Sequence, residues 1–269
     1  MDKSVIVPIF GVIFFVIVLL ILFVILKLLY HSIAFRPSKA IEEKPEEWKE
    51  VWVKDRMNGW FFENHQNRPY VLFCHGNSGS MSYYSQITRL CKAYQFNMFV
   101  FDYSGYGKSR GYPSVKQILT DGLDAYDWLI ESGVNKENII VMGYSLGGAI
   151  ATYIAINRPV NKLWLMNTFS SLDKFVPVKM EKIFSALFET FPTEVRIQEY
   201  AKKGGKTVIM MSDKDGFIPI SHAETLIRNS GGLPLLIQGT HVNPRLPAVT
   251  MKAALEYFGY PTEPDFNYI

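Results

Sequence analysis

The residues whose types and spacing most clearly indicate catalysis form a Gly-x-Ser-x-Gly motif at positions 143–147. An apolar run of strand character, residues 139–142, precedes it, and a helix-compatible segment, residues 146–156, follows it. A nucleophile elbow requires this strand–turn–helix context, which predicts a strained backbone at Ser145. The two glycines of the motif lack the Cβ atoms that would collide in so sharp a turn, and Gly148 would let the helix start close to the neighbouring strand. The alternative is a plain β–α turn with an ordinary serine.

The positions of the histidines narrow the choice of a base. A serine nucleophile needs a base, and in the elbow architecture the base follows both the serine and the acid in chain order. Only His222 and His241 follow Ser145. His241 lies in a loop directly after the last expected core strand, so it could reach over the C-terminal edge of the sheet, and we expect it to be the base. His222 stands near the start of a helix, where we expect a surface or capping role.

The acid must also follow the serine, and four aspartates do so: Asp173, Asp213, Asp215 and Asp265. The first lies in an irregular segment and the last in the C-terminal tail. Asp213 and Asp215 both follow the apolar strand at residues 207–211. Asp215 stands in a turn-rich stretch that leads into the next helix, so we expect it to orient the histidine. Asp213 would then be a solvated turn residue, and it remains the alternative acid.

An oxyanion hole needs two backbone N–H groups directed at the developing negative charge. One should belong to Leu146, directly after the nucleophile. The other should come from the loop at residues 75–78, after an apolar strand, and Asn77 is the expected donor. We expect His75 to hold this loop by a local hydrogen bond.

Several other chemistries are disfavoured. The run Gly107-Lys108-Ser109 matches the end of a phosphate-binding loop, but the glycine required five residues earlier is replaced by Asp102. The dinucleotide fingerprint fails because Arg110 occupies the position of its third glycine. No cluster of histidine, cysteine and aspartate has metal-ligand spacing, so no metal is expected, and the proposed chemistry needs no cofactor. The net charge of +3, without a basic run, gives no indication of nucleic-acid binding.

The N-terminus carries a membrane-compatible segment. Residues 5–26 contain no charged side chain, and 22 residues are enough to cross a hydrocarbon core of about 30 Å. A cleaved signal peptide, with a cleavage site at residues 32–34, is the alternative, but its apolar region would be shorter. We expect an uncleaved single-pass anchor within residues 1–30, followed by a linker at 31–48. The chain would thus contact the lipid bilayer through residues 5–26.

Charge on either side of this segment indicates its orientation. One basic residue, Lys3, precedes it, whereas four follow it within the next eighteen residues: Lys27, Arg36, Lys39 and Lys44. Because basic residues are retained on the cytoplasmic side, the C-terminal domain is expected in the cytoplasm. The absence of any Asn-x-Ser/Thr sequon is consistent with that side. The two cysteines, Cys74 and Cys91, do not provide a disulfide framework, and Cys74 is expected to be a buried thiol.

Residues 49–260 alternate strands with helices and have the length of one α/β domain, with a tail at 261–269. Two short strands, 50–54 and 59–63, should pair antiparallel. Apolar strands are expected at 69–74, 96–101, 139–142, 162–166, 207–211 and 233–237, with helices at 81–94, 114–131, 146–156, 221–228 and 248–258. This alternation predicts a mainly parallel sheet with both faces covered. Residues 169–206 interrupt the pattern.

The combined motifs resemble the α/β-hydrolase superfamily, and more narrowly the membrane-associated α/β-hydrolase-domain proteins, which include protein depalmitoylases and lipid hydrolases. The resemblance covers roughly residues 50–258 and rests on His75-Gly76-Asn77, the loop at 102–109, the elbow at 143–148, Asn167-Thr168-Phe169, Asp215 with Pro219, and Gly239-Thr240-His241. It implies an eight-stranded sheet whose first strands are antiparallel, and a Ser145–Asp215–His241 triad. Two positions depart from the pattern: Val242, where many relatives carry Asn-Asp, and Ser212, where glycine is frequent. The cysteine-rich N-terminus of the depalmitoylase branch is absent.

Residues 169–206 occupy the place where α/β hydrolases commonly carry a lid over the nucleophile. Six apolar residues recur there at three- and four-residue steps and predict one helical stripe: Met180, Ile183, Phe184, Leu187, Phe188 and Phe191. The stripe could pack on the domain, or part of it could line an apolar pocket or meet the bilayer. In the second interpretation Phe169, Phe184 and Phe188 would contact the substrate.

These observations predict a membrane-anchored serine hydrolase of carboxylic esters or thioesters, with lipid or acylated substrates, acting through an acyl-enzyme. A serine peptidase would use the same triad, but it should carry a larger cap or an acidic patch for the substrate amine. A membrane-tethered scaffold without catalytic activity is the other alternative.

Overall fold

The computed structural model describes residues 3–40, 42–63, 68–84 and 93–260. The chain divides into two compact units, Met1–Arg36 and Pro37–Ile269. The first unit is formed by helix α1 (Lys3–Ala34). Its stretch Gly11–Ala34, with a mean hydropathy of 3.5, is long and apolar enough to cross a membrane by length and composition. The residues considered as a cleavage site, 32–34, lie inside this helix, so the first part of the expected linker is helical.

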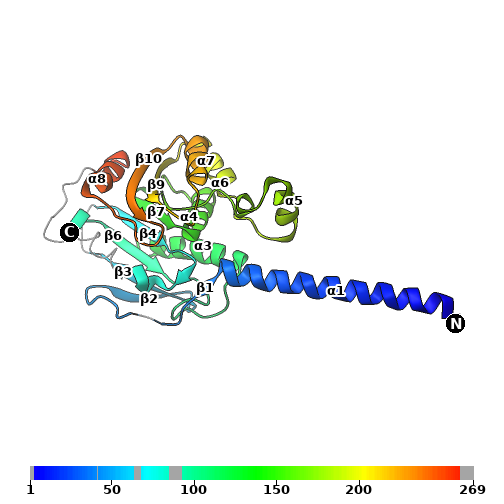
Figure 1. Cartoon of the computed structure of the whole chain (residues 1–269). Coiled ribbons are helices and arrows are strands. Elements are labelled where there is room, and N and C mark those ends of the chain that lie inside the picture. The colour runs from blue at the N-terminus through cyan, green and yellow to red at the C-terminus, as the bar shows by residue number, and fades with distance from the viewer. Residues whose placement is uncertain (1–2, 41, 64–67, 85–92, 261–269) are drawn as a thin grey trace. The chain divides into compact units, whose positions relative to one another are not determined.

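The second unit is built on a mixed sheet, in which the described residues contribute eight strands (Figure 1). They are β2 (Lys49–Val53), β3 (Met57–Phe62), β4 (Tyr70–Cys74), β6 (Asn97–Phe101), β7 (Ile139–Tyr144), β8 (Lys162–Met166), β9 (Lys206–Lys214) and β10 (Leu233–Thr240). Their order is β10-β9-β8-β7-β4-β6-β3-β2. β3 runs antiparallel to both β2 and β6, and every other neighbouring pair is parallel. The expected eight-stranded, mainly parallel sheet is confirmed.

The helices of the domain are α3 (Val115–Glu131), α4 (Leu146–Asn157), α5 (Val178–Leu187), α6 (Thr193–Lys202), α7 (Ile220–Ser230) and α8 (Ala248–Tyr257). Shorter elements are the 3₁₀ helices η1 (Met81–Tyr84), η2 (Lys136–Asn138) and η3 (Leu172–Phe175), and the two-residue strands β1 (Arg36–Pro37) and β5 (Ser78–Gly79). Ser114 caps α3, because its side chain accepts a hydrogen bond from the N–H of Gln117. The helix expected at 81–94 lies largely outside the described residues.

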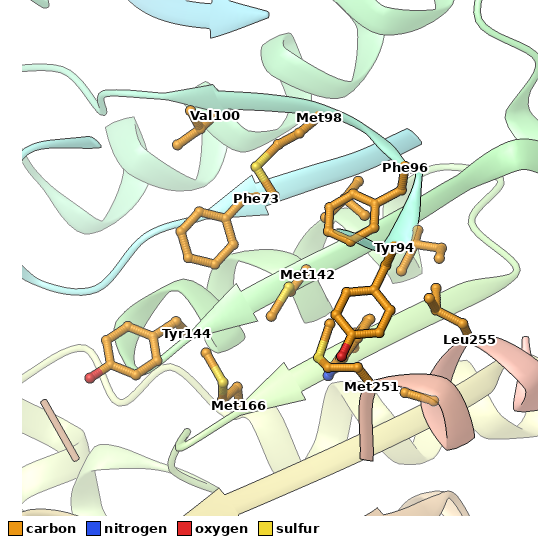
Figure 2. Close-up of a cluster of buried hydrophobic side chains, with 14 of the residues drawn as sticks. Phe73, Tyr94, Phe96, Met98, Val100, Met142, Tyr144, Met166, Met251 and Leu255 are labelled. Carbon is orange, nitrogen blue, oxygen red and sulfur yellow. The ribbon is translucent and has the colours of Figure 1, made fainter. Parts of the chain in front are cut away.

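Side chains at every second strand position enter one apolar core. In β7, Ile140, Met142 and Tyr144 belong to this core, as the two-residue period of a strand requires. Figure 2 shows Met142 and Tyr144 in the same cluster as Met251 and Leu255 of α8, which therefore packs on this face of the sheet. Helices α3, α4, α6 and α7 contact one another in turn. The sheet thus holds its strand ends in fixed positions, and the loops at those ends carry the chemistry.

The segment between β8 and β9 contains η3, α5 and α6, and it corrects the expected helical stripe. α5 ends at Leu187, and the next residue, Phe188, has an extended backbone. Phe191 has a positive φ of 51° and is buried. The apolar periodicity of the sequence therefore continues beyond the helix that it predicted. Phe191 packs with Phe169 in the domain, with ring centroids 6.3 Å apart.

Residues 38–48, expected to be a linker, are held on the domain. The N–H of Ser38 donates a hydrogen bond to the carbonyl of Gly79, and the carbonyl of Ser38 accepts a hydrogen bond from the N–H of Gly107. The N–H of Glu42 donates to Ser82 Oγ. Trp48 is buried and stacks on Phe62, with ring centroids 5.3 Å apart. The chain is therefore fixed to the second unit from Ser38 onward.

Candidate active site

The turn between β7 and α4 has the strained geometry that the motif predicted. Ser145 has φ 53° and ψ −120°, and its carbonyl accepts a hydrogen bond of 2.6 Å from Thr168 Oγ1. A Cβ at Gly147 would lie 1.9 Å from the carbonyl oxygen of Cys74, and one at Gly143 would lie 2.3 Å from that of Gly147. A Cβ at Gly148 would collide with Thr168, which follows the neighbouring strand. The glycines therefore let the partly exposed serine stand between two closely packed elements.

Three loops at the C-terminal ends of β7, β9 and β10 bring the expected triad together. His241 Nε2 lies 3.0 Å from Ser145 Oγ, and His241 Nδ1 lies 2.7 Å from Asp215 Oδ2. In a neutral imidazole with the proton on Nδ1, the ring donates to the carboxylate and its Nε2 accepts from the serine hydroxyl. His241 is 8 % exposed, so water is largely excluded from this chain of hydrogen bonds.

The carboxylate of Asp215 is oriented by the backbone that follows it. Its Oδ1 accepts hydrogen bonds of 2.9 Å from the N–H groups of Phe217 and Ile218. Its Oδ2 is thereby directed to His241. Asp213 is exposed, as expected, but it lies within β9 rather than in a turn, and its Oδ1 accepts a 2.9 Å hydrogen bond from the N–H of Gly239. Asp213 thus connects the ends of β9 and β10.

Two residues that the sequence analysis did not assign hold the loop of the base. The hydroxyl of Tyr144 donates to the backbone carbonyl of His241. Asn167, at the end of β8, has a positive φ of 46°, and its Nδ2 lies 3.4 Å from the same carbonyl. Its side chain also bonds Ser212, with Nδ2 2.9 Å from Oγ and Oδ1 2.8 Å from the N–H. The sequence signal that could have identified Asn167 was a polar residue at the end of a strand, inside the motif Asn167-Thr168-Phe169.

The expected oxyanion donors lie at the first residue of α4 and in the loop that follows β4. Leu146 is the first residue of α4, so its N–H falls outside the intrahelical hydrogen bonds. The Asn77 N–H shares a rigid peptide plane with the carbonyl of Gly76, and that carbonyl lies 2.7 Å from His75 Nδ1. Tyr106 donates a 2.9 Å hydrogen bond to the carbonyl of Asn77. His75 therefore fixes the orientation of the peptide that could bind the oxyanion, in agreement with the local role expected for it.

His75 and Asp102 form a buried titratable pair behind this loop. His75 Nε2 lies 3.6 Å from Asp102 Oδ1, and within the described residues it has no hydrogen-bond partner. Burial lowers the pKa of His75 to about 4 and raises the pKa of Asp102 to about 7. His75 is therefore neutral near pH 7, as donation from Nδ1 to the Gly76 carbonyl with an unprotonated Nε2 requires.

The second candidate histidine is not a surface residue, contrary to expectation. His222 is buried in the first turn of α7, and burial lowers its pKa. Its Nδ1 accepts from the N–H of Ser170 and lies 2.9 Å from the Ser170 hydroxyl. The ring of Phe175 stacks on it, with centroids 4.5 Å apart. His222 thus attaches the start of the segment between β8 and β9 to α7, and it takes no part in the hydrogen bonds of Ser145.

The expected substrate-contacting phenylalanines differ in their environment. Phe169 is buried and packs with Phe175 and Phe191, whereas Phe184 and Phe188 are partly exposed, with ring centroids 5.0 Å apart. A small cavity of about 70 Å³ lies beside Asp215. Ligand pockets commonly measure roughly 300–1,000 Å³, so this cavity is too small for a long acyl group.

Comparison with known proteins agrees with the fold. The family model for the alpha/beta hydrolase fold matches residues 69–195. Protein YfhR of Escherichia coli O157:H7 is 31% identical over 219 residues, which are 74% of this chain and 76% of that protein. A Mycobacterium tuberculosis protein is 29% identical over 177 residues, or 64% of this chain, and the match spans 62% of that relative's length.

Solved structures with similar folds include hydrolases. An esterase of Pyrococcus furiosus superposes with a TM-score of 0.60 at 17% identity, covering 77% of this chain and 89% of the esterase. A thioesterase domain from the curacin biosynthetic pathway superposes with a TM-score of 0.53 at 11% identity, covering 80% of this chain and 99% of that domain. At such identities the likeness concerns the fold. The sheet order, the elbow and these matches together define the class: the chain belongs to the α/β-hydrolase family.

Proposed function

We propose that this protein is a serine hydrolase of carboxylic esters or thioesters, and that it acts through a Ser145–Asp215–His241 triad. The observation that carries the proposal is the unbroken set of contacts from Asp215 Oδ2 to His241 Nδ1 and from His241 Nε2 to Ser145 Oγ. An esterase and a thioesterase domain among the structures of similar fold support this reaction class.

The proposed reaction proceeds in two steps. His241 Nε2 accepts the Ser145 proton while Oγ attacks the carbonyl carbon, and the imidazolium that forms is stabilised by Asp215. The same proton then passes to the leaving alcohol or thiol, which departs as the acyl-enzyme forms. In the second step His241 activates a water molecule, which attacks the acyl-enzyme and regenerates the serine hydroxyl. No metal or cofactor takes part in this sequence.

The negative charge of each tetrahedral intermediate would be bound by the N–H groups of Leu146 and Asn77. The first lies at the N-terminus of α4, where the helix dipole favours an anion. The second has its direction fixed by the contact between His75 and the Gly76 carbonyl. Because both donors are oriented before substrate binds, little reorganisation is needed in the transition state.

The finer part of the proposal is that α1 is an uncleaved anchor and that the substrates are lipids or acylated molecules. The 24-residue stretch Gly11–Ala34 supports the anchor by its length and hydropathy. The basic residues that follow residue 26 support a cytoplasmic hydrolase domain. The apolar residues of the lid region, Phe169, Phe184 and Phe188 among them, would form part of the acyl-binding surface.

Labelling with a fluorophosphonate probe tests the triad directly. Wild-type protein should be labelled covalently at Ser145, whereas Ser145→Ala should lose labelling and ester turnover with a nearly unchanged thermal midpoint. Ser230→Ala, a remote serine substitution at the end of α7, serves as the control and should label normally. Full labelling and turnover in Ser145→Ala would contradict the proposal, and labelled protein that hydrolysed no ester or thioester would favour another reaction.

A chain-length series tests the substrate class. If the acyl group contacts the lid, kcat/KM should rise from acetyl to octanoyl esters, because each buried CH₂ contributes about 0.8 kcal/mol. Phe184→Ala should blunt that rise more than it lowers acetate hydrolysis, whereas Val195→Ala, an exposed apolar site on α6, should not. A flat or falling chain-length profile would instead indicate a hydrolase of small esters.

A further inference from the structure

Three exposed apolar side chains stand on the loops that carry Asp215 and His241 or at the first residue of α7, directly after the Asp215 loop. Phe217 is 69 % exposed, Ile220 is 59 % exposed and Val242 is 74 % exposed. The Phe217 ring lies beside the His241 ring, with centroids 5.4 Å apart, and Val242 is the next residue in the chain. We call these three residues the apolar rim. Exposed apolar groups gathered at an active-site loop mark a surface that meets an apolar partner.

Two basic side chains lie next to or on the same two loops. Lys214, directly before Asp215, and Arg245, four residues after His241, line one cleft of about 370 Å³ together with polar residues of the strand ends. Both are exposed. The acidic residue of the cleft, Asp213, already accepts a hydrogen bond from Gly239. An apolar rim beside two cations is the arrangement that suits anionic headgroups above an acyl-chain layer.

The covalent connection to α1 limits how far the start of the second unit lies from the end of that helix. α1 ends at Ala34, and the N–H of Ser38 is already bonded to the domain. Three residues lie between these two points, and an extended chain of that length spans at most about 14 Å. If α1 spans the membrane, the hydrolase unit is held at the membrane surface and has no long linker with which to leave it.

We propose that the loops carrying Asp215 and His241 dock on the surface of an anionic bilayer. The apolar rim enters the boundary of the acyl-chain layer, and Lys214 and Arg245 contact lipid phosphates or carboxylates. The substrate ester then reaches Ser145 from the membrane plane rather than from bulk water. This inference rests on the proposed anchor and hydrolase activity, and it adds the surface through which the site receives a lipid-borne substrate.

Depth-dependent fluorescence quenching in vesicles tests the docking. Val242→Cys is made in a Cys91→Ser background, labelled with a nitrobenzoxadiazole fluorophore and reconstituted as the full chain. The vesicles contain phosphatidylcholine with or without phosphatidylserine, and a brominated-chain lipid serves as quencher. Emission should shift to the blue and lose intensity with brominated lipid, most strongly when phosphatidylserine is present. Ile220→Cys should behave in the same way if the Val242 variant folds poorly.

The control label is placed at Lys136, which lies in η2 at the opposite end of β7 from Ser145. Lys136→Cys should show no shift and no quenching. A second comparison replaces both Lys214 and Arg245 with alanine, which should remove the additional quenching that phosphatidylserine produces. The proposal would be overturned if the labels at both Val242 and Ile220 were unquenched, or if the label at Lys136 were quenched equally. It would also be overturned if the effect of phosphatidylserine on quenching were unchanged in the variant that lacks both cations.

Two further measurements on the same samples test the docking surface separately from the proposed anchor and the proposed hydrolase activity. Resistance to alkaline carbonate extraction reports anchoring by α1, and fluorophosphonate labelling reports the triad. Anchored and labelled protein with an unquenched rim would overturn the docking surface alone. Protein that is extracted or unlabelled would instead contradict the proposed anchor or the proposed hydrolase activity.

Discussion

The hydroxyl of Tyr144 donates a hydrogen bond to the backbone carbonyl of His241, and the two rings lie 5.3 Å apart. Tyr144 is the residue directly before Ser145, and it lies 97 positions before His241 in the chain. The end of β7 therefore supports both the serine and the loop that carries the histidine. Burial raises the pKa of Tyr144 above its ordinary value, so the phenol stays protonated and remains a donor.

Tyr144→Phe should lower kcat by roughly fivefold while KM changes little, because a lost hydrogen bond of about 1 kcal/mol loosens the position of the imidazole. Steady-state kinetics with one soluble ester provide the measurement. The matched control is Tyr126→Phe, which removes a hydroxyl that donates to the Pro159 carbonyl in another part of the domain. Equal losses of kcat in the two variants would show that the Tyr144 hydroxyl does not position His241.

The two neighbouring aspartates should differ greatly in their effect on catalysis. Asp215→Asn removes the acceptor that fixes the imidazole tautomer, and kcat should fall by about 10⁴, as in the corresponding serine-protease substitution. Asp213→Asn keeps an oxygen that can accept from Gly239, so kcat should stay within about threefold of wild type. Purified variants compared at saturating ester provide the test, and the reverse ranking would assign the acid to Asp213.

The buried pair His75 and Asp102 should produce opposing effects of pH on stability. The pKa of His75 falls from 6.5 to about 4, so between these values only the unfolded chain binds that proton, and stability rises with pH. The pKa of Asp102 rises from 3.8 to about 7, so between these values only the folded chain holds that proton, and stability falls as pH rises. From about pH 4 to 6.5 the two effects oppose each other.

Asp102→Asn should therefore uncover the contribution of His75. The thermal midpoint of this variant should rise more steeply between about pH 4.5 and 6.5 than that of wild type, as followed by circular dichroism in detergent. Asp127→Asn, which affects a partly exposed ion pair with Arg158, is the control and should keep the wild-type slope. A slope in Asp102→Asn that is no steeper than wild type would argue against a titrating pair.

The distribution of basic residues predicts the topology of the anchor. With Lys27, Arg36, Lys39 and Lys44 retained on the cytoplasmic side, an Asn-x-Thr sequon added after Ile269 should remain unglycosylated in cells. The same tagged domain behind a cleavable secretory signal should be glycosylated, which shows that the acceptor is usable. Glycan addition to the native arrangement would place the domain on the luminal side.

Much of the fold and the elbow could be predicted because their determinants are local. A Cβ added at position 143, 147 or 148 would lie within hard-sphere distance of backbone or side-chain atoms. The requirement for glycine at these positions is therefore visible in the motif itself. Short apolar runs predicted the core strands, and chain order restricted the candidate base to two histidines. Apolar periodicity predicted the end of the helix wrongly in the segment between β8 and β9. Phe188 and Phe191 continue the three- and four-residue spacing after α5 has ended. A pattern of apolar residues does not specify where tertiary contacts replace helical hydrogen bonds.

By itself, the sequence determined the α/β pattern, the strained serine and the small set of residues that could accompany it. Only the tertiary structure decided that Asp215 contacts His241 while Asp213 connects two strand ends, and that His222 is buried beneath Phe175. It also decided that Tyr144 and Asn167 hold the loop of the base. These contacts join loops far apart in the chain, and they exist because the order β10-β9-β8-β7 brings those strand ends to one edge of the sheet.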